Sequence, residues 1–454
     1  MSDLQAFVQQ QRERMLNELF ALLKIPSVST DPARVPDCRR AANWVADHLK
    51  ALGCPKVELL ASDSHPVVWA EGPVVPGKPT VLVYGHYDVQ PAEPLELWDS
   101  PPFEPTVRDG NLYARGATDD KGQTFAVIKA FEAVSRGGRP PVNLRFLIEG
   151  QEESGSKVLF DLLDREPERV AVDAVLVADT GYFAPGWPAV EVGLRGLCAA
   201  EITVRTLKGD LHSGLYGGAA PNAIEALMHL LGRLKTPDGK IHIPGLYGAV
   251  RRPSVAERAG WTKLPFKEAK FQREEVGSKA LTGLKGYSVL ERVWGLPTFE
   301  IHGIVGGFIG EGSKTVIPAV ATAKVTLRLV PNQTTKGVAK LLTAAAKKLA
   351  PKWADVSVKI LHGADPVLVD ISARPFKLMD QAFREVEGRG IVTTRSGGSI
   401  PVVPALGKKG APVILSGIGL PDDRLHAPNE KIGVEQVFNG IRVFGRFFEL
   451  MGET

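Results

Sequence analysis

Short apolar runs and segments of helical periodicity alternate along the chain. Between the first two runs, Phe125, Ile128, Phe131 and Val134 recur at the spacing of one helix face. The apolar runs have the length of buried strands and cover residues 81–84, 142–148, 174–178 and 413–415. This alternation predicts an α/β fold, with a mostly parallel sheet wrapped by helices.

The pattern changes near residue 196, where a second domain is expected. Its predicted elements are a strand at 197–205, a helix at 221–234, a strand at 322–330, a helix at 334–349 and a strand at 356–361. Few signals stand out between residues 235 and 321. From about residue 366, a helix near 376–386 and the last apolar run return to the first sheet. We therefore predict a main domain in two parts, 1–195 and 366–454, with an inserted α+β domain at 196–365.

Composition narrows the class of protein. With 454 residues, 44% hydrophobic and 23% charged, the chain is typical of a globular protein with more than one core. Its net charge of +4 is mild, and the basic residues are spread out, so no nucleic-acid partner is expected. No apolar run reaches the roughly 18 residues of a membrane span, and the N-terminus MSDLQAFVQQQRERM is polar, so we expect a cytoplasmic protein without a membrane partner. The three cysteines lack the spacing of a redox or zinc motif.

Polar side chains follow three successive strand candidates. His86 and Asp88 follow the first, Glu152 and Glu153 the second, and Asp179 the third. Because ligands bind at the carboxyl ends of strands in open α/β sheets, these residues are expected to converge. The spacing of His86 and Asp88 lets the carboxylate accept the ring proton and orient the imidazole. The alternative for Glu152 and Glu153 alone is a solvated turn.

Two further segments add carboxylates and a second histidine. The string GATDDKGQ contains Asp119, the better ligand candidate, and Asp120, for which an N-cap of the following helix is the alternative. His426 lies in the turn-rich string LPDDRLHAPNE. The ligand candidates contain only imidazole and carboxylate, which suits zinc, manganese or cobalt, and they are His86, Asp119, Glu153, Asp179 and His426.

Five ligands exceed the three that one catalytic zinc uses, so we expect two metal ions that share a carboxylate. Glu152 is then free to act as the general acid/base.

Two other motifs that could indicate a function are rejected. GFIGEGSKT has Ser313 where a P-loop needs lysine, and Ser399 in SGGSIPVV lacks the context of a nucleophile elbow.

The strings GHYDVQP, GATDDKGQ and EGQEESGS resemble, in order and spacing, the motifs of the cocatalytic-zinc metallopeptidases and amidohydrolases. This family includes carboxypeptidase G, succinyl-diaminopimelate desuccinylase, aminoacylase and carnosinase-like dipeptidases. The resemblance runs from about residue 10 to the C-terminus and implies a catalytic main domain and an inserted lid and dimerisation domain. It also implies that the peptide bond after the bridging aspartate is cis. The implied roles are His86 and Asp179 on one ion, Glu153 and His426 on the other, Asp119 as the bridge, Asp88 orienting His86, and Glu152 as general acid/base.

The strings DLHSGLYGGAAPN, KTVIP, LRLVPNQ and GGSIPVV are most similar to the cytosolic nonspecific dipeptidase and carnosinase branch. By this resemblance, His212 polarises the scissile carbonyl across a dimer interface and Arg328 receives the terminal carboxylate of the substrate. Each residue also has an alternative role without function. His212 could be a hydrogen-bond partner within its loop, and Arg328 could be an ordinary exposed residue of a strand. Further implied substrate contacts are Thr315, Gly398 and Ser399.

One departure from the family pattern concerns the wall beside Asp179. The family often has serine before this aspartate and asparagine or an acid shortly after it, whereas the string here is Ala178, Asp179, Thr180, Gly181. The ligand is kept, but the identity of the substrate is left open.

The expected protein is a homodimeric dinuclear-metal hydrolase. Metal-bound hydroxide would cleave the amide bond of dipeptides or similar small peptide-like substrates, with zinc as the first choice of ion and manganese or cobalt as alternatives. A second reading is a deacylase of N-acyl or N-succinyl amino acids. A reading of another class is a metal-binding scaffold without catalysis, although such a scaffold has no use for an unliganded acid beside a ligand.

Overall fold

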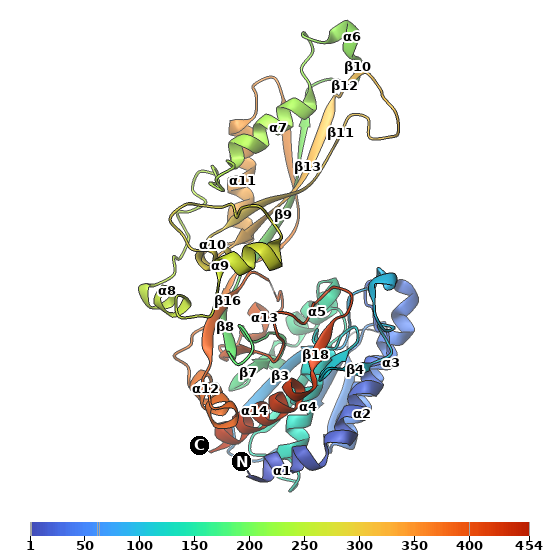
Figure 1. The fold of residues 1–454 in the computed structure, drawn as a ribbon, viewed down its shortest axis with the longest axis vertical. Helices are drawn as coiled ribbons and strands as arrows, with labels where there is room; N and C mark the ends of the chain where they lie inside the picture. Colours follow the sequence, from blue (N-terminus) through green and yellow to red (C-terminus); the bar gives the residue numbers. More distant parts are fainter. Residues whose placement is uncertain (1, 61, 63, 399, 454) are drawn as a thin grey trace. The chain divides into compact units, whose positions relative to one another are not determined.

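The chain forms two compact units (Figure 1). The computed structural model describes residues 2–60, 62, 64–398 and 400–453. Unit 1 consists of Met1–Val192, Val369–Thr394 and Ile400–Thr454, and unit 2 of Gly193–Leu368 and Arg395–Ser399. Within the described part of the chain, no helix has the length and apolar character needed to cross a bilayer.

Unit 1 contains most strands of a mixed sheet whose centre is parallel, and one edge strand, β15, lies in the residues assigned to unit 2. The strand order is β1-β2-β6-β3-β7-β17-β8-β15, with β16 also paired to β8. The bounds are β1 (Lys56–Leu60), β2 (Val67–Glu71), β3 (Thr80–His86), β6 (Asn143–Glu149), β7 (Ala174–Val177), β8 (Ala189–Leu194), β15 (Val367–Leu368), β16 (Val392–Ser396) and β17 (Val413–Ser416). The pairs β6–β3, β3–β7 and β7–β17 are parallel, which confirms the predicted α/β class. The flanking pairs β1–β2, β2–β6 and β17–β8 are antiparallel.

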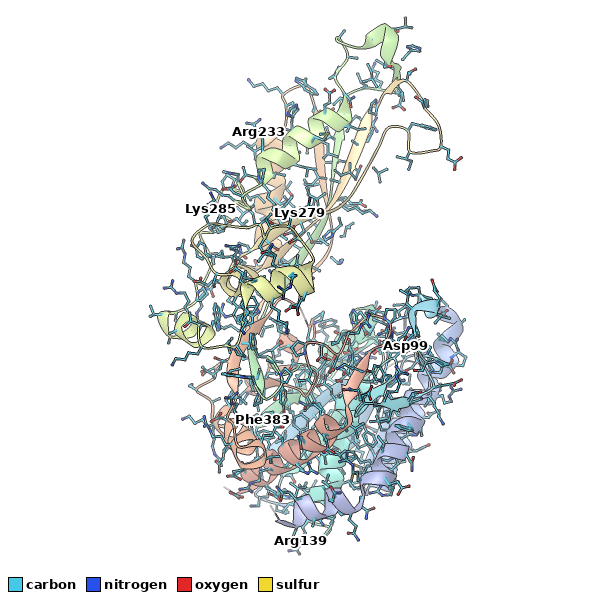
Figure 2. The ribbon with its side chains drawn as sticks, in the orientation of Figure 1. Asp99, Arg139, Arg233, Lys279, Lys285 and Phe383 are labelled. Carbon is cyan, nitrogen blue, oxygen red and sulfur yellow. The ribbon has the colours of Figure 1, made fainter. Side chains whose placement is uncertain are left out.

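Helices cover this sheet. They are α1 (Ser2–Gln10), α2 (Arg12–Leu23), α3 (Val35–Ala51), α4 (Lys121–Val134), α5 (Lys157–Arg165), α12 (Arg374–Glu387), α13 (Val403–Leu406) and α14 (Val434–Gly452). Helix α4 is buried on nearly all sides because it packs against β3 and against α14, which lies alongside it in Figure 1. Phe383 of α12, labelled in Figure 2, packs against Tyr182 in an edge-to-face arrangement with the ring centroids 5.9 Å apart. Asp119 and Asp120, which directly precede α4, are therefore joined to a helix that is buried in the core.

Short strands and one-turn helices fill the connections of unit 1. A three-stranded sheet has the order β18-β5-β4, with β4 (Thr106–Arg108), β5 (Asn111–Tyr113) and β18 (Lys431–Gly433). The 3₁₀ turns are η1 (Pro32–Arg34), η2 (Leu95–Leu97), η3 (Glu152–Ser154) and η4 (Pro167–Val170). Through β18 and β5, the segment that follows His426 lies beside the segment that precedes Asp119.

Unit 2 contains a four-stranded antiparallel sheet in the order β11-β13-β9-β14. The bounds are β9 (Gly196–Arg205), β11 (Thr298–Gly306), β13 (Val320–Leu329) and β14 (Asp355–Ala364), and a separate pair is β10 (Leu211–His212) with β12 (Val316–Ile317). Helices α7 (Ala223–Leu234) and α11 (Thr335–Leu349) pack on this sheet, and α6 (Ser213–Tyr216) is a single turn. In β13 the buried residues alternate with less buried ones, which is why the sequence predicted this strand.

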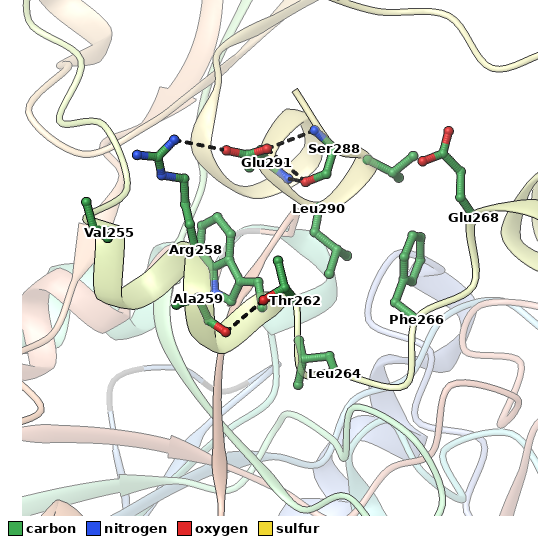
Figure 3. A pocket seen from close by; sticks show the side chains of 12 residues that line it. Val255, Arg258, Ala259, Thr262, Leu264, Phe266, Glu268, Ser288, Leu290 and Glu291 are labelled. Carbon is green, nitrogen blue, oxygen red and sulfur yellow. Dashed lines mark hydrogen bonds and ion pairs between the residues drawn. The ribbon is translucent and has the colours of Figure 1, made fainter. Parts of the chain in front are cut away.

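Several elements lie between residues 235 and 321, where the sequence analysis found few signals. They are α8 (Val255–Trp261), α9 (Glu268–Lys270), the short π-helix η5 (Phe271–Val276), α10 (Val289–Gly295) and β11. Ser254 and Ser288 start α8 and α10 with capping boxes. Helices α8 and α10 line a pocket of about 550 Å³ (Figure 3), where Arg258 lies 3.8 Å from Glu291. Strand β11 escaped prediction because a bulge between Ile301 and Gly303 interrupts the alternation of its side chains.

Candidate metal centre

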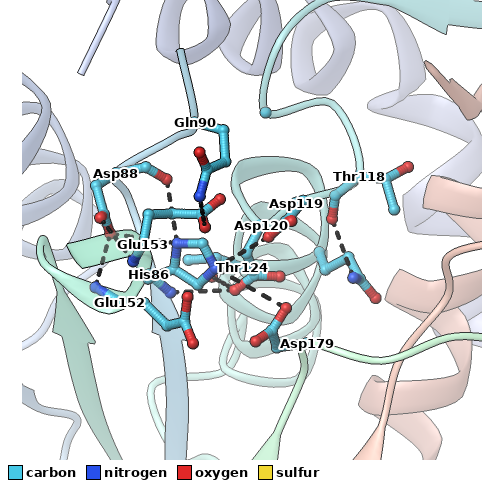
Figure 4. Close-up of polar contacts among 12 residues, drawn as sticks. His86, Asp88, Gln90, Thr118, Asp119, Asp120, Thr124, Glu152, Glu153 and Asp179 are labelled. Carbon is cyan, nitrogen blue, oxygen red and sulfur yellow. Dashed lines mark hydrogen bonds and ion pairs between the residues drawn. The ribbon is translucent and has the colours of Figure 1, made fainter. Parts of the chain in front are cut away.

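The carboxyl ends of three adjacent parallel strands meet at one place in unit 1. His86 is the last residue of β3, Glu152 and Glu153 form the turn η3 after β6, and Asp179 follows β7 by two residues. Since the strand order is β6-β3-β7, the three ends lie side by side. Figure 4 shows the imidazole of His86 directed at Asp119 and Asp179.

Among the described residues, two groups of side chains have the geometry to hold a metal ion, and they share Asp119. In the first group, His86 Nε2 lies 3.2 Å from Asp119 Oδ1 and 3.9 Å from Asp179 Oδ1. In the second, His426 Nε2 lies 2.9 Å from Asp119 Oδ2 and 3.5 Å from Glu153 Oε2. Within each group the ligand atoms lie within 4.8 Å of one another. The two oxygens of Asp119 thus face two different sites, as a bridging carboxylate requires.

Asp88 connects His86 with the turn that contains the paired glutamates. His86 Nδ1 lies 3.1 Å from the carbonyl oxygen of Asp88 and 3.3 Å from its Oδ1. The Asp88 carboxylate also accepts the N–H groups of Glu152 at 3.3 Å and Glu153 at 3.1 Å, and the Ser29 hydroxyl at 2.6 Å. Asp88 is fully buried. One carboxylate therefore fixes both the ring of His86 and the backbone that carries Glu152 and Glu153.

The start of α4 places Asp119 and Asp120 differently. The peptide bond between them is cis, as the family resemblance implied. Asp120 occupies the N-cap position of α4, but its side chain makes no capping bond to the helix backbone. Instead Asp120 Oδ2 accepts the N–H of His86 at 3.1 Å and the Thr124 hydroxyl at 2.7 Å. The N-cap alternative therefore holds for the position of Asp120 in the chain, while its carboxylate bonds to His86 and Thr124 and not to the backbone of the helix.

Burial and mutual repulsion set the pKa values of the acids. Burial raises the pKa of Glu153 to about 8, and the charge of Asp119 adds to the effect. Burial, with the charge of Asp120, raises the pKa of Asp179 well above its ordinary range. Burial also raises the pKa of Glu152. Burial also acts to raise the pKa of Asp119, but its hydrogen bonds with His426 and His86 outweigh this effect and hold its pKa below the usual range.

The residues present fit two divalent cations. The buried Glu153 Oε1 has no hydrogen-bond partner among the described residues, although its carboxylate belongs to one of the ligand groups. So many carboxylates in one buried place can ionise together only if a cation compensates them. Unit 1 as a whole carries 29 Lys and Arg against 38 Asp and Glu, a net charge of −9, which favours cations. The ligands are imidazole and carboxylate, which suits zinc, manganese or cobalt.

Comparison with known proteins identifies the family. The model of peptidase family M20/M25/M40 matches residues 82–450. The chain belongs to this family. A Cys-Gly metallodipeptidase of Candida albicans is 33% identical and covers 98% of this chain and 96% of its own length. A Beta-Ala-His dipeptidase of Mus musculus is 33% identical and covers 84% of this chain and 79% of its own length.

Solved structures of M20/M25/M40 proteins have the same fold. The di-peptidase Dug1p from Saccharomyces cerevisiae is 28% identical, with a TM-score of 0.84 over 100% of this chain and 98% of that one. Human carnosine dipeptidase 1 is 29% identical, with a TM-score of 0.83 over 100% of this chain and 99% of that one. The predicted likeness to the dipeptidase and carnosinase branch is thereby confirmed.

The candidate substrate residues of this M20/M25/M40 chain lie in unit 2. His212 is exposed, and its Nδ1 accepts the N–H of Gly214 at 3.0 Å, so the loop hydrogen bond considered for it is present. Arg328 lies on β13 and is partly buried, and burial lowers its pKa. Thr315 is exposed, and Gly398 donates its N–H to the Ser396 hydroxyl at 3.0 Å. Ser399 lies outside the described residues.

Sequence reasoning missed three polar residues that support the centre. Gln90 donates to Glu153 Oε2 at 2.7 Å, Ser29 donates to Asp88, and Glu430 binds the segment that leads to Asp119. Gln90 and Glu430 each stand four residues after a histidine of the centre, and this spacing was the signal that could have identified them from the sequence. Ser29 is 59 residues from Asp88 in sequence, so no local pattern could reveal the contact.

Proposed function

We propose that this M20/M25/M40 protein is a hydrolase that uses two divalent metal ions to cleave the amide bond of dipeptides and similar small peptide-like substrates. The observation that carries the proposal is the position of Asp119, whose two carboxylate oxygens face two separate ligand groups. The names of the relatives, Cys-Gly metallodipeptidase and Beta-Ala-His dipeptidase, support the choice of dipeptides.

In this proposal His86 and Asp179 would hold one ion, Glu153 and His426 would hold the other, and Asp119 would bind both. Zinc is the first choice, with manganese and cobalt as alternatives. When bound, the ions supply Lewis-acid chemistry, because they polarise a carbonyl oxygen and lower the pKa of water.

Glu152 moves the proton. It stands beside Glu153 in η3, and Asp88 accepts the N–H groups of both residues, so the backbone of the turn is fixed. Glu152 takes a proton from the attacking water as the carbon–oxygen bond forms. It then gives this proton to the amine nitrogen as the carbon–nitrogen bond breaks, and the carboxylate is regenerated.

Arg328 is proposed to bind the carboxylate at the C-terminal end of the substrate, because its planar fork matches a carboxylate. Arg328→Met should raise KM for dipeptides by about 10- to 100-fold, since a hydrogen bond to a charged group contributes about 1.5–3 kcal/mol. Steady-state kinetics should show a much smaller change for dipeptide amides, which lack the carboxylate.

Lys324→Met is a matched control for Arg328, because Lys324 lies four residues away on the same face of β13. This variant should keep the KM of the wild type. If Arg328→Met raises KM equally for dipeptides and their amides, the carboxylate role is wrong.

A homodimer is proposed in which His212 of one protomer contacts the scissile carbonyl bound by its partner. Strand β11 is an edge of the sheet of unit 2, and its Ile304 and Val305 are 49% and 56% exposed. An exposed apolar edge strand is a ready surface for a second copy. We expect a sedimentation mass near twice 48.9 kDa and a monomer for Ile304→Lys.

Ile360→Lys, on the opposite edge strand β14, serves as the control for the dimer and should remain dimeric. A wild-type monomer with full activity would contradict the dimer and the role of His212. The cytoplasmic location remains a prediction.

A comparison of rates tests the proposed substrate class. With zinc or manganese supplied, Cys-Gly and β-Ala-His should be cleaved faster than N-acetyl amino acids or N-succinyl-diaminopimelate. Faster release of acetyl or succinyl groups would favour the deacylase reading. Two bound ions with no turnover on any of these compounds would favour a metal-binding scaffold.

A further inference from the structure

Glu430 is a fully buried carboxylate whose four hydrogen bonds all go to the segment that ends at Asp119. Its Oε2 accepts from Arg115 Nη1 at 2.6 Å and from the N–H of Gly116 at 3.0 Å. Its Oε1 accepts the N–H groups of Thr118 and Asp119, each at 3.0 Å. Every partner is a donor, so an ionised carboxylate satisfies all of them.

Glu430 joins two loops that are far apart in the sequence and that each carry a ligand candidate. Glu430 stands four residues after His426 and directly before β18, which pairs with β5 and so lies beside the segment before Asp119. The carboxylate therefore joins the loop that carries His426 to the loop that carries Asp119. Asp119 and His426 are 307 residues apart in sequence, and their ligand atoms must meet within a few tenths of an ångström for an ion to bind both.

Other contacts strengthen the same junction. Arg115 is almost fully buried and also donates to the carbonyl oxygen of Pro91 at 3.0 Å. The Thr118 hydroxyl donates to Asp423 Oδ2 at 2.9 Å, and Asp423 Oδ1 accepts from Lys431 Nζ at 3.1 Å. These contacts hold the two loops together from several sides, but among the described residues only Glu430 bonds to the N–H of Asp119 itself.

We propose that Glu430 is a positioning residue of the metal centre, which fixes the backbone of Asp119 relative to His426 so that one carboxylate can serve both ions. This role rests on the proposed function. Asp88 does the corresponding work on the other side, where it links His86 to the turn of Glu153. Asp88 and Glu430, both fully buried carboxylates, thus connect the segments that carry four ligand candidates.

The role predicts a specific fault in Glu430→Gln. Glutamine has the same shape, but its amide nitrogen would face two N–H donors, either those of Arg115 and Gly116 or those of Thr118 and Asp119. The loop before Asp119 must then move. Loss of a residue that orients a metal ligand typically weakens metal affinity by about 10- to 100-fold.

Cobalt affinity is the measurement that separates positioning from simple stability. Metal-free wild type, Glu430→Gln and Glu430→Asp are titrated with Co²⁺ against a competing chelator, and the visible spectrum of bound cobalt is recorded. We expect Glu430→Gln to bind cobalt about 10- to 100-fold more weakly with an altered spectrum. Glu430→Asp keeps the charge and should fall between the two.

Glu132→Gln is the matched control. Glu132 is a shielded carboxylate on α4 that accepts from Lys129 at 2.8 Å and Arg14 at 2.5 Å, away from the ligands. This variant should lower the melting temperature and leave cobalt affinity unchanged.

Wild-type affinity in folded Glu430→Gln overturns the positioning role. If that variant does not fold, Glu430→Asp decides the matter, and unchanged affinity and spectrum there overturn the role as well. A wild-type protein that takes up no cobalt overturns the metal centre itself, and the role of Glu430 with it.

Discussion

Replacing Glu152 with glutamine should lower kcat by about 10²- to 10⁴-fold and leave two metal ions bound per chain. Glutamine keeps the size of the side chain but cannot take a proton from water. The ions should remain, because Glu152 belongs to neither group of ligand candidates. The measurement is a rate assay and elemental analysis on the same preparation.

The neighbouring variant Glu153→Gln is the informative comparison for Glu152. Glu153 Oε2 lies 3.5 Å from His426 Nε2, so its loss should release an ion, whereas the loss of Glu152 should not. If Glu152→Gln retains full activity, the assignment of the proton shuttle is wrong. If it loses metal as readily as Glu153→Gln, the division of labour between the two glutamates is wrong.

Asp119→Asn should reduce the metal content to one ion or fewer per chain and bring activity below detection. The carboxylate presents one oxygen to the group of His86 and the other to the group of His426. An amide offers a single oxygen, and its NH₂ group has no lone pair for an ion. Elemental analysis before and after gel filtration, together with a dipeptidase assay, would measure both effects.

Asp120→Asn is the matched control for Asp119. Asp120 lies next to Asp119 in the chain, but it belongs to neither group of ligand candidates among the described residues. Asparagine can still accept the N–H of His86 and the Thr124 hydroxyl through its oxygen. Asp120→Asn should therefore keep both ions. Equal loss of metal in both variants would contradict the special place of Asp119.

Much of the fold of unit 1 could be predicted from sequence because its central strands are buried on both faces. The apolar runs at β3, β6, β7 and β17 mark these strands directly, and polar residues mark their ends. The structure brings His86, Glu153 and Asp179 together, while their roles as ligands remain proposals. At the flanks, β1 is partly exposed and β15 has only two residues, so these strands leave a weaker pattern.

The parts of the fold and of the site that could not be predicted depend on contacts between distant parts of the chain. Glu430 and Asp119 are 311 residues apart, and only the folded chain shows that they are bonded. The segment before β11 consists of short helices held by capping boxes and by the packing of Trp261 against Trp294 at 5.2 Å. Elements this short do not repeat an apolar spacing often enough to be recognised from sequence.

Anomalous diffraction from crystals grown with zinc tests the central claim most directly. We expect two peaks per chain, one between His86 and Asp179 and one between Glu153 and His426, each within bonding distance of a different oxygen of Asp119. A single peak, or peaks that Asp119 does not touch, would contradict a shared dinuclear centre.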